Sequence, residues 1–137
     1  MILHFDIVVN SIEKSKKFYT KYFGFSEIDS GFIEGHCSKF ISNNKYERFE
    51  LCVLKHSEIG TNLELIEYES SYKNLSICPG ITLALLSNNL NKDVKRIALL
   101  GLNPASEIYH ITTQKGTYNI IFYKDPDGYL IEMLEIA

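Results

Sequence analysis

The sequence predicts an α+β fold built from two copies of one strand-helix-strands module. Three observations support this prediction. Two short apolar runs each precede capping residues and an amphipathic segment, a glycine follows each amphipathic segment, and further strand-like runs follow each glycine. Neither module alone has enough apolar surface for a stable core. We therefore expect two βαβββ modules with facing antiparallel curved sheets around a central cavity, and with the helices outside.

The first module is expected to occupy residues 1–72. It begins with a strand over residues 3–9, a run rich in β-branched side chains, and the oxygens of Asn10 and Ser11 are suited to cap a helix. Apolar residues then recur at three- and four-residue steps among lysines until Gly24, which fits a left-handed C-terminal cap. The pattern predicts a helix over residues 11–23. Strands are expected to follow near residues 37–42, 48–55 and 63–68.

The second module, residues 78–137, follows the same plan. A strand is expected over residues 81–86 and a helix over residues 90–100, with the capping pair Asn88 and Asn89 before the helix and Gly101 after it. Strands near residues 107–113, 117–123 and 129–136 complete the module. The sequence DPDG at residues 125–128 predicts a hairpin turn between the last two strands, because proline presets φ and glycine closes the turn.

Length and composition narrow the possible functions. A chain of 137 residues with 45% hydrophobic residues is in the size range of one domain, so we expect residues 1–137 to form a single domain. The formal net charge of -3, with both signs scattered, provides no basic surface for nucleic acid or for a membrane. The three cysteines, Cys37, Cys52 and Cys78, lack a Cys-x-x-Cys spacing. This is typical of reduced thiols in a cytoplasmic protein.

Several short segments follow one another in a specific order. They are HFDIVV at residues 4–9, SIEKS at 11–15, LEL at 63–65, PGI at 79–81 and DPDGYLIE at 125–132. Together they resemble the glyoxalase/bleomycin resistance/dioxygenase superfamily, which is also called the vicinal oxygen chelate superfamily. The resemblance covers nearly the whole chain. It implies the two-module fold, a small-molecule substrate or ligand, and a homodimer.

The resemblance also implies a metal site. In this family, residues from the first and last strands of each module hold a divalent metal, usually two His or Gln and two Glu. By position, His4, Glu64 and Glu132 match three of these ligands, and Thr82, whose hydroxyl is a poor ligand, occupies the fourth position. His4 and Thr82 each lie eight residues before the first apolar residue of the following helix, which supports the match. Imidazole and carboxylate ligands suit Zn, Ni, Mn or Fe. A metal-free site is the alternative.

Strand parity gives an argument for the glutamates that is independent of the resemblance. Glu64 and Glu132 each interrupt an apolar strand, so each points to the face opposite its neighbours. If that face lines a cavity, an unpaired carboxylate is costly and favours a cation or a proton. Glu67 and Glu135 lie three residues further along, so they point to the other face, where we expect them to meet solvent. The alternative is that Glu64 and Glu132 are solvated as well.

Three classes of function are left open. The first is a metal-dependent lyase or isomerase similar to glyoxalase I (lactoylglutathione lyase) or methylmalonyl-CoA epimerase, in which Glu132 or Glu64 moves a proton and a vicinal-oxygen substrate passes through an enediolate. The second is a metal-free protein of the bleomycin-resistance type that sequesters a small molecule. A third class, a ring-cleaving dioxygenase, needs a second histidine ligand, for which His110 is the candidate. The sequence contains no P-loop, nucleophile elbow or dinucleotide fingerprint.

Overall fold

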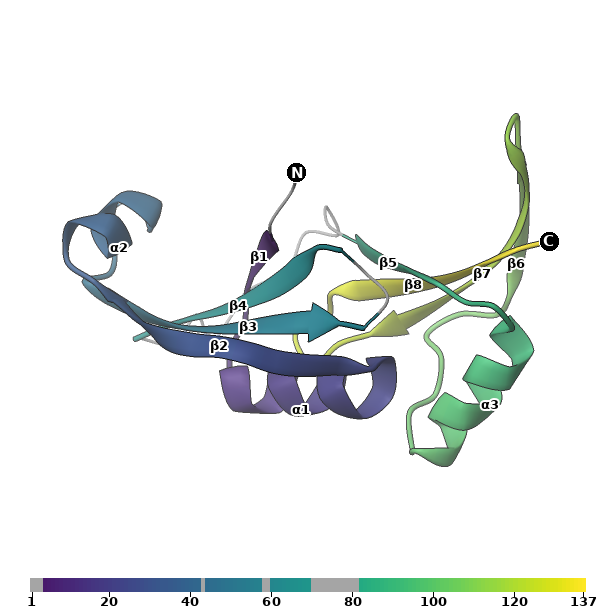
Figure 1. Ribbon diagram of the computed structural model, residues 1–137, viewed down its shortest axis with the longest axis horizontal. Coiled ribbons are helices and arrows are strands. Elements are labelled where there is room, and N and C mark those ends of the chain that lie inside the picture. Colours follow the sequence, from purple (N-terminus) through teal and green to yellow (C-terminus); the bar gives the residue numbers. More distant parts are fainter. Residues whose placement is uncertain (1–3, 43, 58–59, 70–81) are drawn as a thin grey trace. The chain divides into compact units, whose positions relative to one another are not determined.

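The computed structural model of this chain describes residues 4–42, 44–57, 60–69 and 82–137 (Figure 1). The chain divides into two compact units at residues 76 and 77, and each unit contains one four-stranded sheet. The α+β class and the repetition of one module are therefore confirmed. That both modules belong to a single domain stays a prediction. No helix in the described ranges is long and apolar enough to cross a membrane.

The first unit contains six elements. In chain order they are β1 (His4–Val8), α1 (Ile12–Phe23), β2 (Phe25–Glu34), α2 (His36–Ile41), β3 (Arg48–His56) and β4 (Asn62–Tyr68). The strands lie in the order β1-β4-β3-β2. β1 runs parallel to β4, whereas the other neighbouring strands are antiparallel. The sheet is therefore mixed, with one parallel pair beside the antiparallel pairs that the sequence predicts. β1 and β4 are distant in the chain, so a crossover can join them in the same direction.

The second unit repeats this topology with one helix fewer among its described residues. Its elements are β5 (Thr82–Leu86), α3 (Leu90–Leu99), β6 (Tyr109–Thr113), β7 (Gly116–Lys124) and β8 (Leu130–Ile136). The strand order is β5-β8-β7-β6, with β5 parallel to β8 and the other pairs antiparallel. β5 thus corresponds to β1, and β8 corresponds to β4.

Both long helices begin and end close to the predicted positions. The backbone N–H of Lys14 donates to Ser11 Oγ (3.2 Å) at the start of α1, and Gly24 adopts φ 73° at its end. At the start of α3, the backbone N–H of Lys92 donates to Asn89 Oδ1 (2.9 Å). These contacts satisfy backbone groups that a helix terminus otherwise leaves unpaired.

The long helices α1 and α3 each pack their apolar side onto one face of their own sheet. In Figure 1, α1 runs along the β2, β3 and β4 strands of the first sheet. Tyr19 and Phe23 of α1 are buried, as are Leu63 and Leu65 of β4. In the second unit, Ile97 of α3 is buried. We call the face of each sheet that lies opposite its long helix, α1 or α3, the open face of that sheet.

Two elements of the first unit differ from the prediction. Residues 36–41 form the helix α2 rather than a strand, because Gly35 at φ 72° ends β2 and the hydroxyl of Ser38 donates to the Tyr46 carbonyl (2.9 Å). The strand β2 was not predicted. It is an edge strand whose residues are mostly exposed, so it lacks the apolar alternation of a half-buried strand.

The predicted hairpin turn before β8 is present. Asp125 is buried, and its Oδ1 accepts from the backbone N–H groups of Asp127 (2.9 Å) and Tyr129 (2.8 Å). Gly128 adopts φ 91°, which glycine tolerates without strain. This turn sets the register that brings Glu132 opposite Phe122 of β7.

Candidate functional site

Three side chains that can bind a metal meet on the open face of the first sheet. Asp6 of β1 and Glu64 of β4 are direct partners in the parallel register of the two strands. His4 lies two residues before Asp6 on the same strand, so it points to the same face. The three ligand atoms lie within 4.8 Å of one another. The structure therefore brings together the predicted residues His4 and Glu64, and adds Asp6.

The imidazole of His4 lies between the two carboxylates. Its Nε2 is 3.3 Å from Asp6 Oδ1 and 3.8 Å from Glu64 Oε2. The Glu64 side chain is 13% exposed, compared with 37% for His4 and 48% for Asp6. Glu64 is thus the most deeply placed of the three, and solvent reaches the group from the side of Asp6.

Burial raises the pKa of the Glu64 carboxyl above its ordinary value, and repulsion from Asp6 raises it further. The nearby His4 opposes this shift in pKa. Both causes of the increase disfavour a negative charge at Glu64. A positive charge beside the two carboxylates would relieve this cost, so the electrostatics of the group favour a cation or a proton.

In the second unit, Glu132 occupies the position that Glu64 occupies in the first. Glu132 is the register partner of Ala84 on β5, as Glu64 is the partner of Asp6 on β1. Thr82 is two residues before Ala84 and so corresponds to His4. Its backbone belongs to β5, but its side chain lies outside the described residues. The convergence of Glu132 and Thr82 with the first unit's residues stays a prediction.

Glu67 and Glu135 do not simply face solvent. The backbone N–H of Ile12, the first residue of α1, donates to Glu67 Oε2 (3.4 Å). In the second unit the N–H of Leu90, the first residue of α3, donates to Glu135 Oε1 (3.1 Å). Strand parity predicts that Glu67 and Glu135 lie on the faces opposite Glu64 and Glu132. In the structure, the faces that carry Glu67 and Glu135 are covered by α1 and α3. The expectation of free solvation was wrong, because the carboxylates pair with helix N-termini.

His110 lies on the face of the second sheet opposite Glu132. Its ring contacts the amide of Asn119 (Nδ1 to Oδ1, 2.5 Å), and Asn119 Nδ2 donates to Glu135 Oε2 (3.3 Å). The three residues are cross-strand neighbours on β6, β7 and β8. Because Glu132 and Glu135 are three residues apart on one strand, they cannot share a face. His110 therefore cannot join Glu132 in one metal site.

Sequence reasoning missed Asp6 as a member of the group. The signal was present in the spacing, because a carboxylate two residues after a histidine in a strand shares its face. The family pattern takes one ligand from each strand, so it does not predict a second ligand on the strand of His4. The parallel pairing of β1 with β4 then places Asp6 beside Glu64.

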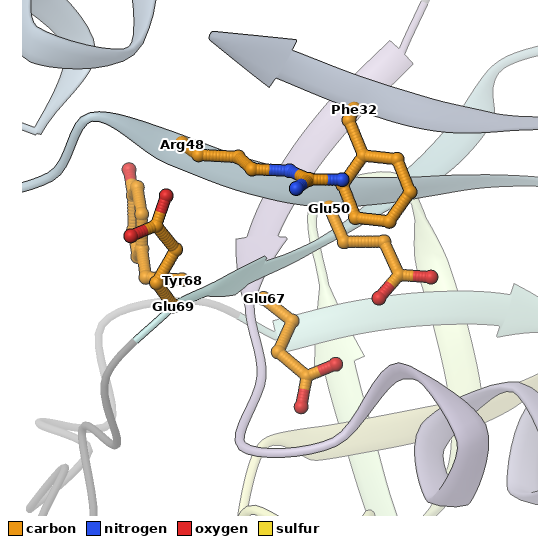
Figure 2. Close-up of a pocket in the computed structure, with 6 residues that line it drawn as sticks. All are labelled: Phe32, Arg48, Glu50, Glu67, Tyr68 and Glu69. Carbon is orange, nitrogen blue, oxygen red and sulfur yellow. The ribbon is translucent and has the colours of Figure 1, made fainter.

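A separate cleft of about 560 Å³ opens on the α1 side of the first sheet (Figure 2). Phe32, Glu50 and Glu67 are cross-strand partners in its wall. The guanidinium of Arg48 lies over the Phe32 ring, 3.7 Å from its centre, and Arg48 Nε is 3.3 Å from Glu34 Oε1. Since Glu67 and Glu64 point to opposite faces of β4, this cleft is distinct from the group formed by His4, Asp6 and Glu64.

Known structures share this fold. A glyoxalase family protein from Bacillus cereus has a TM-score of 0.73 at 14% identity, over 98% of this chain and 93% of its own. The trypanothione-dependent glyoxalase I of Leishmania major has a TM-score of 0.65 at 22% identity, over 98% and 86%. An antibiotic binding protein from Streptomyces has a TM-score of 0.64 at 20% identity, over 100% and 96%.

The comparison with protein families is more specific than these structural likenesses. No curated protein matches the chain. The family model named Glyoxalase/Bleomycin resistance protein/Dioxygenase superfamily matches residues 1–133. Because this match extends over both modules, the chain belongs to the glyoxalase/bleomycin resistance protein/dioxygenase superfamily.

Proposed function

We propose that this chain is a metal-dependent lyase or isomerase that acts on a small molecule with two adjacent oxygen atoms. The observation that carries the proposal is the pair His4 and Glu64, whose ligand atoms lie 3.8 Å apart on the open face of the first sheet. Imidazole and carboxylate form a donor set that suits Zn, Ni, Mn or Fe. The raised pKa of Glu64 supports the fit, because an ionised carboxylate there gains from a neighbouring cation.

In this proposal His4, Glu64 and Glu132 hold the ion, and Thr82 occupies the fourth position. The matched registers of Glu64 with Asp6 and of Glu132 with Ala84 support an equivalent role for the two glutamates. A bound divalent cation would polarise the substrate oxygens and so acidify the adjacent C–H group.

A carboxylate of the chain then moves the proton, and Glu64 and Glu132 are the candidates. The carboxylate takes the proton from one carbon, holds it on an oxygen atom, and returns it to the neighbouring carbon as an enediolate collapses, while the hydroxyl proton passes from the first substrate oxygen to the second. A proton carrier works best when its pKa is near the working pH. The pKa of Glu64 is raised from its ordinary value of 4.5, which brings it closer to neutral pH.

A metal-free small-molecule binder is the second candidate function. Its support is the second module, which has Thr82 and Ala84 at the positions of His4 and Asp6. These two residues provide no strong ligand. The antibiotic binding protein from Streptomyces shows that the same fold occurs in a protein described as a binder. In this alternative, Glu64 and Glu132 would contact a bound molecule and transfer no proton.

We further propose that the chain forms a homodimer. Apolar side chains remain exposed on the described surface, among them Phe40 (87%), Leu99 (90%) and Phe5 (55%). Exposed apolar groups of this size often mark a contact with another protein surface.

Exchange of a substrate proton with deuterated water tests the enzymatic proposal. The protein is loaded with Zn, Ni, Mn or Fe and incubated with α-hydroxycarbonyl compounds and with hemithioacetals of 2-oxoaldehydes, and exchange at the carbon is followed by ¹H NMR. We expect metal-dependent exchange that Glu64→Gln abolishes. Glu13→Gln, an equal change of charge on the exposed side of α1, should have no effect. Tight binding of a panel compound by metal-free protein, without exchange, would support the binder instead.

A further inference from the structure

We infer that Asp6 is a further ligand of the metal, so that the first module provides three ligands, His4, Asp6 and Glu64. The inference rests on the proposed function, which requires a metal at His4 and Glu64. It adds a ligand at a position that the family resemblance does not imply.

Two of the ligand-atom distances are close to those around a single ion, and all three ligand atoms lie within 4.8 Å of one another. Two ligand atoms that each bind an ion at about 2.1 Å lie about 3.0 to 3.4 Å apart in octahedral or tetrahedral geometry. His4 Nε2 and Asp6 Oδ1 are 3.3 Å apart, which is within this range. His4 Nε2 and Glu64 Oε2 are 3.8 Å apart, so a small rotation of the Glu64 side chain brings this pair into the range.

The strand register holds Asp6 in place. Asp6 and Glu64 are direct partners on two adjacent parallel strands, so their Cα positions are fixed by the sheet. His4 is on the same strand as Asp6, and the alternation of a strand directs both side chains to one face. All three ligands therefore project from β1 and β4, and no loop has to move to assemble them.

The charges of the group are unbalanced without a cation. Two carboxylates that are direct partners on neighbouring strands repel each other. Among the described residues, the one ion-pair partner of either carboxylate is His4, which carries charge only when protonated. A divalent cation bound between Asp6 and Glu64 balances both negative charges and leaves the imidazole neutral, as a ligand must be.

The comparison of the two modules gives an independent reason. The second module has Thr82 where the first has His4, and Ala84 where the first has Asp6. Of these register positions in the second module, the one with a strong ligand is Glu132. The second module therefore lacks a strong ligand at both positions of its first strand. In the first module, Asp6 adds a ligand that compensates for this lack.

Titration with Mn²⁺ tests the inference, with the EPR signal of the free ion as the readout. We expect the wild-type protein to bind one Mn²⁺, and Asp6→Asn to raise the Kd at least about tenfold, since even changes of outer residues cost this much at many metal sites. The control Glu13→Gln, on the exposed side of α1, should leave the Kd unchanged. Circular dichroism establishes that each variant is folded.

A variant that keeps a ligand at position 6 shows whether a loss of binding comes from the lost ligand or from a loss of folding. Asp6→His replaces an oxygen ligand by a nitrogen ligand, so this variant should bind metal more tightly than Asp6→Asn does. It should also have a stronger preference for Zn²⁺ over Mn²⁺ than the wild type has. The inference is overturned if Asp6→Asn binds Mn²⁺ like the wild type while Glu64→Ala does not, and in that case the proposed function stands. If the wild type binds no Mn²⁺, Zn²⁺, Ni²⁺ or Fe²⁺, the proposed function fails as well.

Discussion

The carboxylate of Glu67 accepts a hydrogen bond from the backbone N–H of Ile12, the first residue of α1 (3.4 Å). Glu135 and Leu90 repeat this contact in the second unit (3.1 Å). In each unit, the last strand therefore carries one glutamate that pairs with the helix and another, three residues earlier, that points to the open face. Glu67 and Glu135 thus have a structural role at the helix N-termini, which differs from the metal-binding role proposed for Glu64.

Removing the Glu67 carboxylate should destabilise the protein without changing metal binding. Glu67→Ala leaves the N–H of Ile12 without its carboxylate partner, and we expect the free energy of unfolding to fall by about 1 kcal/mol. Glu67→Gln keeps an acceptor oxygen and should cost less. Urea unfolding measures both changes. Glu69→Ala, at an exposed position after β4, is the control, and an equal loss in this control would show that the contact with α1 contributes nothing.

The raised pKa of Glu64 predicts a specific dependence of stability on pH in metal-free protein. Above the ordinary pKa of 4.5, the unfolded chain releases the Glu64 proton while the folded chain still holds it. This group therefore makes stability fall as the pH rises from 4.5 to the folded pKa. Glu64→Gln cannot ionise, so it should be more stable than the wild type at pH 7, and the difference should narrow below pH 4.5.

Urea unfolding between pH 4 and pH 7 in the presence of a chelator measures this difference. A Glu64→Gln variant that is less stable than the metal-free wild type at pH 7 would contradict the assignment of Glu64 to a site that disfavours negative charge. Adding the metal should reverse the order, because a bound ion stabilises only the folded wild type.

His110 should be dispensable for metal binding. It contacts Asn119 on the helix-covered face of the second sheet, away from Glu132. We expect His110→Ala to leave the Mn²⁺ affinity unchanged within about twofold, well inside the tenfold effects seen when metal-site residues are altered. A loss of affinity as large as that of His4→Ala would show that His110 is a ligand and would restore the dioxygenase alternative.

The mass of the protein in solution tests the proposed homodimer. Light scattering coupled to size exclusion should give twice the 15.7 kDa of one chain at high concentration. Leu99→Lys and Phe40→Lys place charge on the two most exposed large apolar side chains in the described part of the chain, and we expect at least one of them to favour the monomer. A monomer mass at every concentration of the wild type would contradict the proposal.

Local sequence signals predicted the two long helices, the turn at residues 125–128 and most strands, because each depends on neighbouring residues. The cap at Ser11 and the buried Asp125 are examples. The edge strand β2 was missed because both of its faces are largely exposed, and α2 was mistaken for a strand because its six residues are too few to show a helical period.

The candidate site was only partly predictable, because part of it depends on pairing between distant strands. Parity alone placed Glu64 and Glu67 on opposite faces, which the structure confirms. The capping role of Glu67 and the position of Asp6 beside Glu64 required the parallel register of β1 with β4. No local pattern specifies that register, since the two strands are separated by most of the first module.

The metal content of the purified protein tests the central claim most directly. Protein prepared without chelator, incubated with Zn, Ni, Mn or Fe and then desalted, is analysed by inductively coupled plasma mass spectrometry. We predict about one equivalent of one of these metals per chain in the wild type and in Glu13→Gln, and less than about a tenth of an equivalent in Glu64→Ala and His4→Ala. A wild type without metal, or a Glu64→Ala variant that retains a full equivalent, would contradict the account.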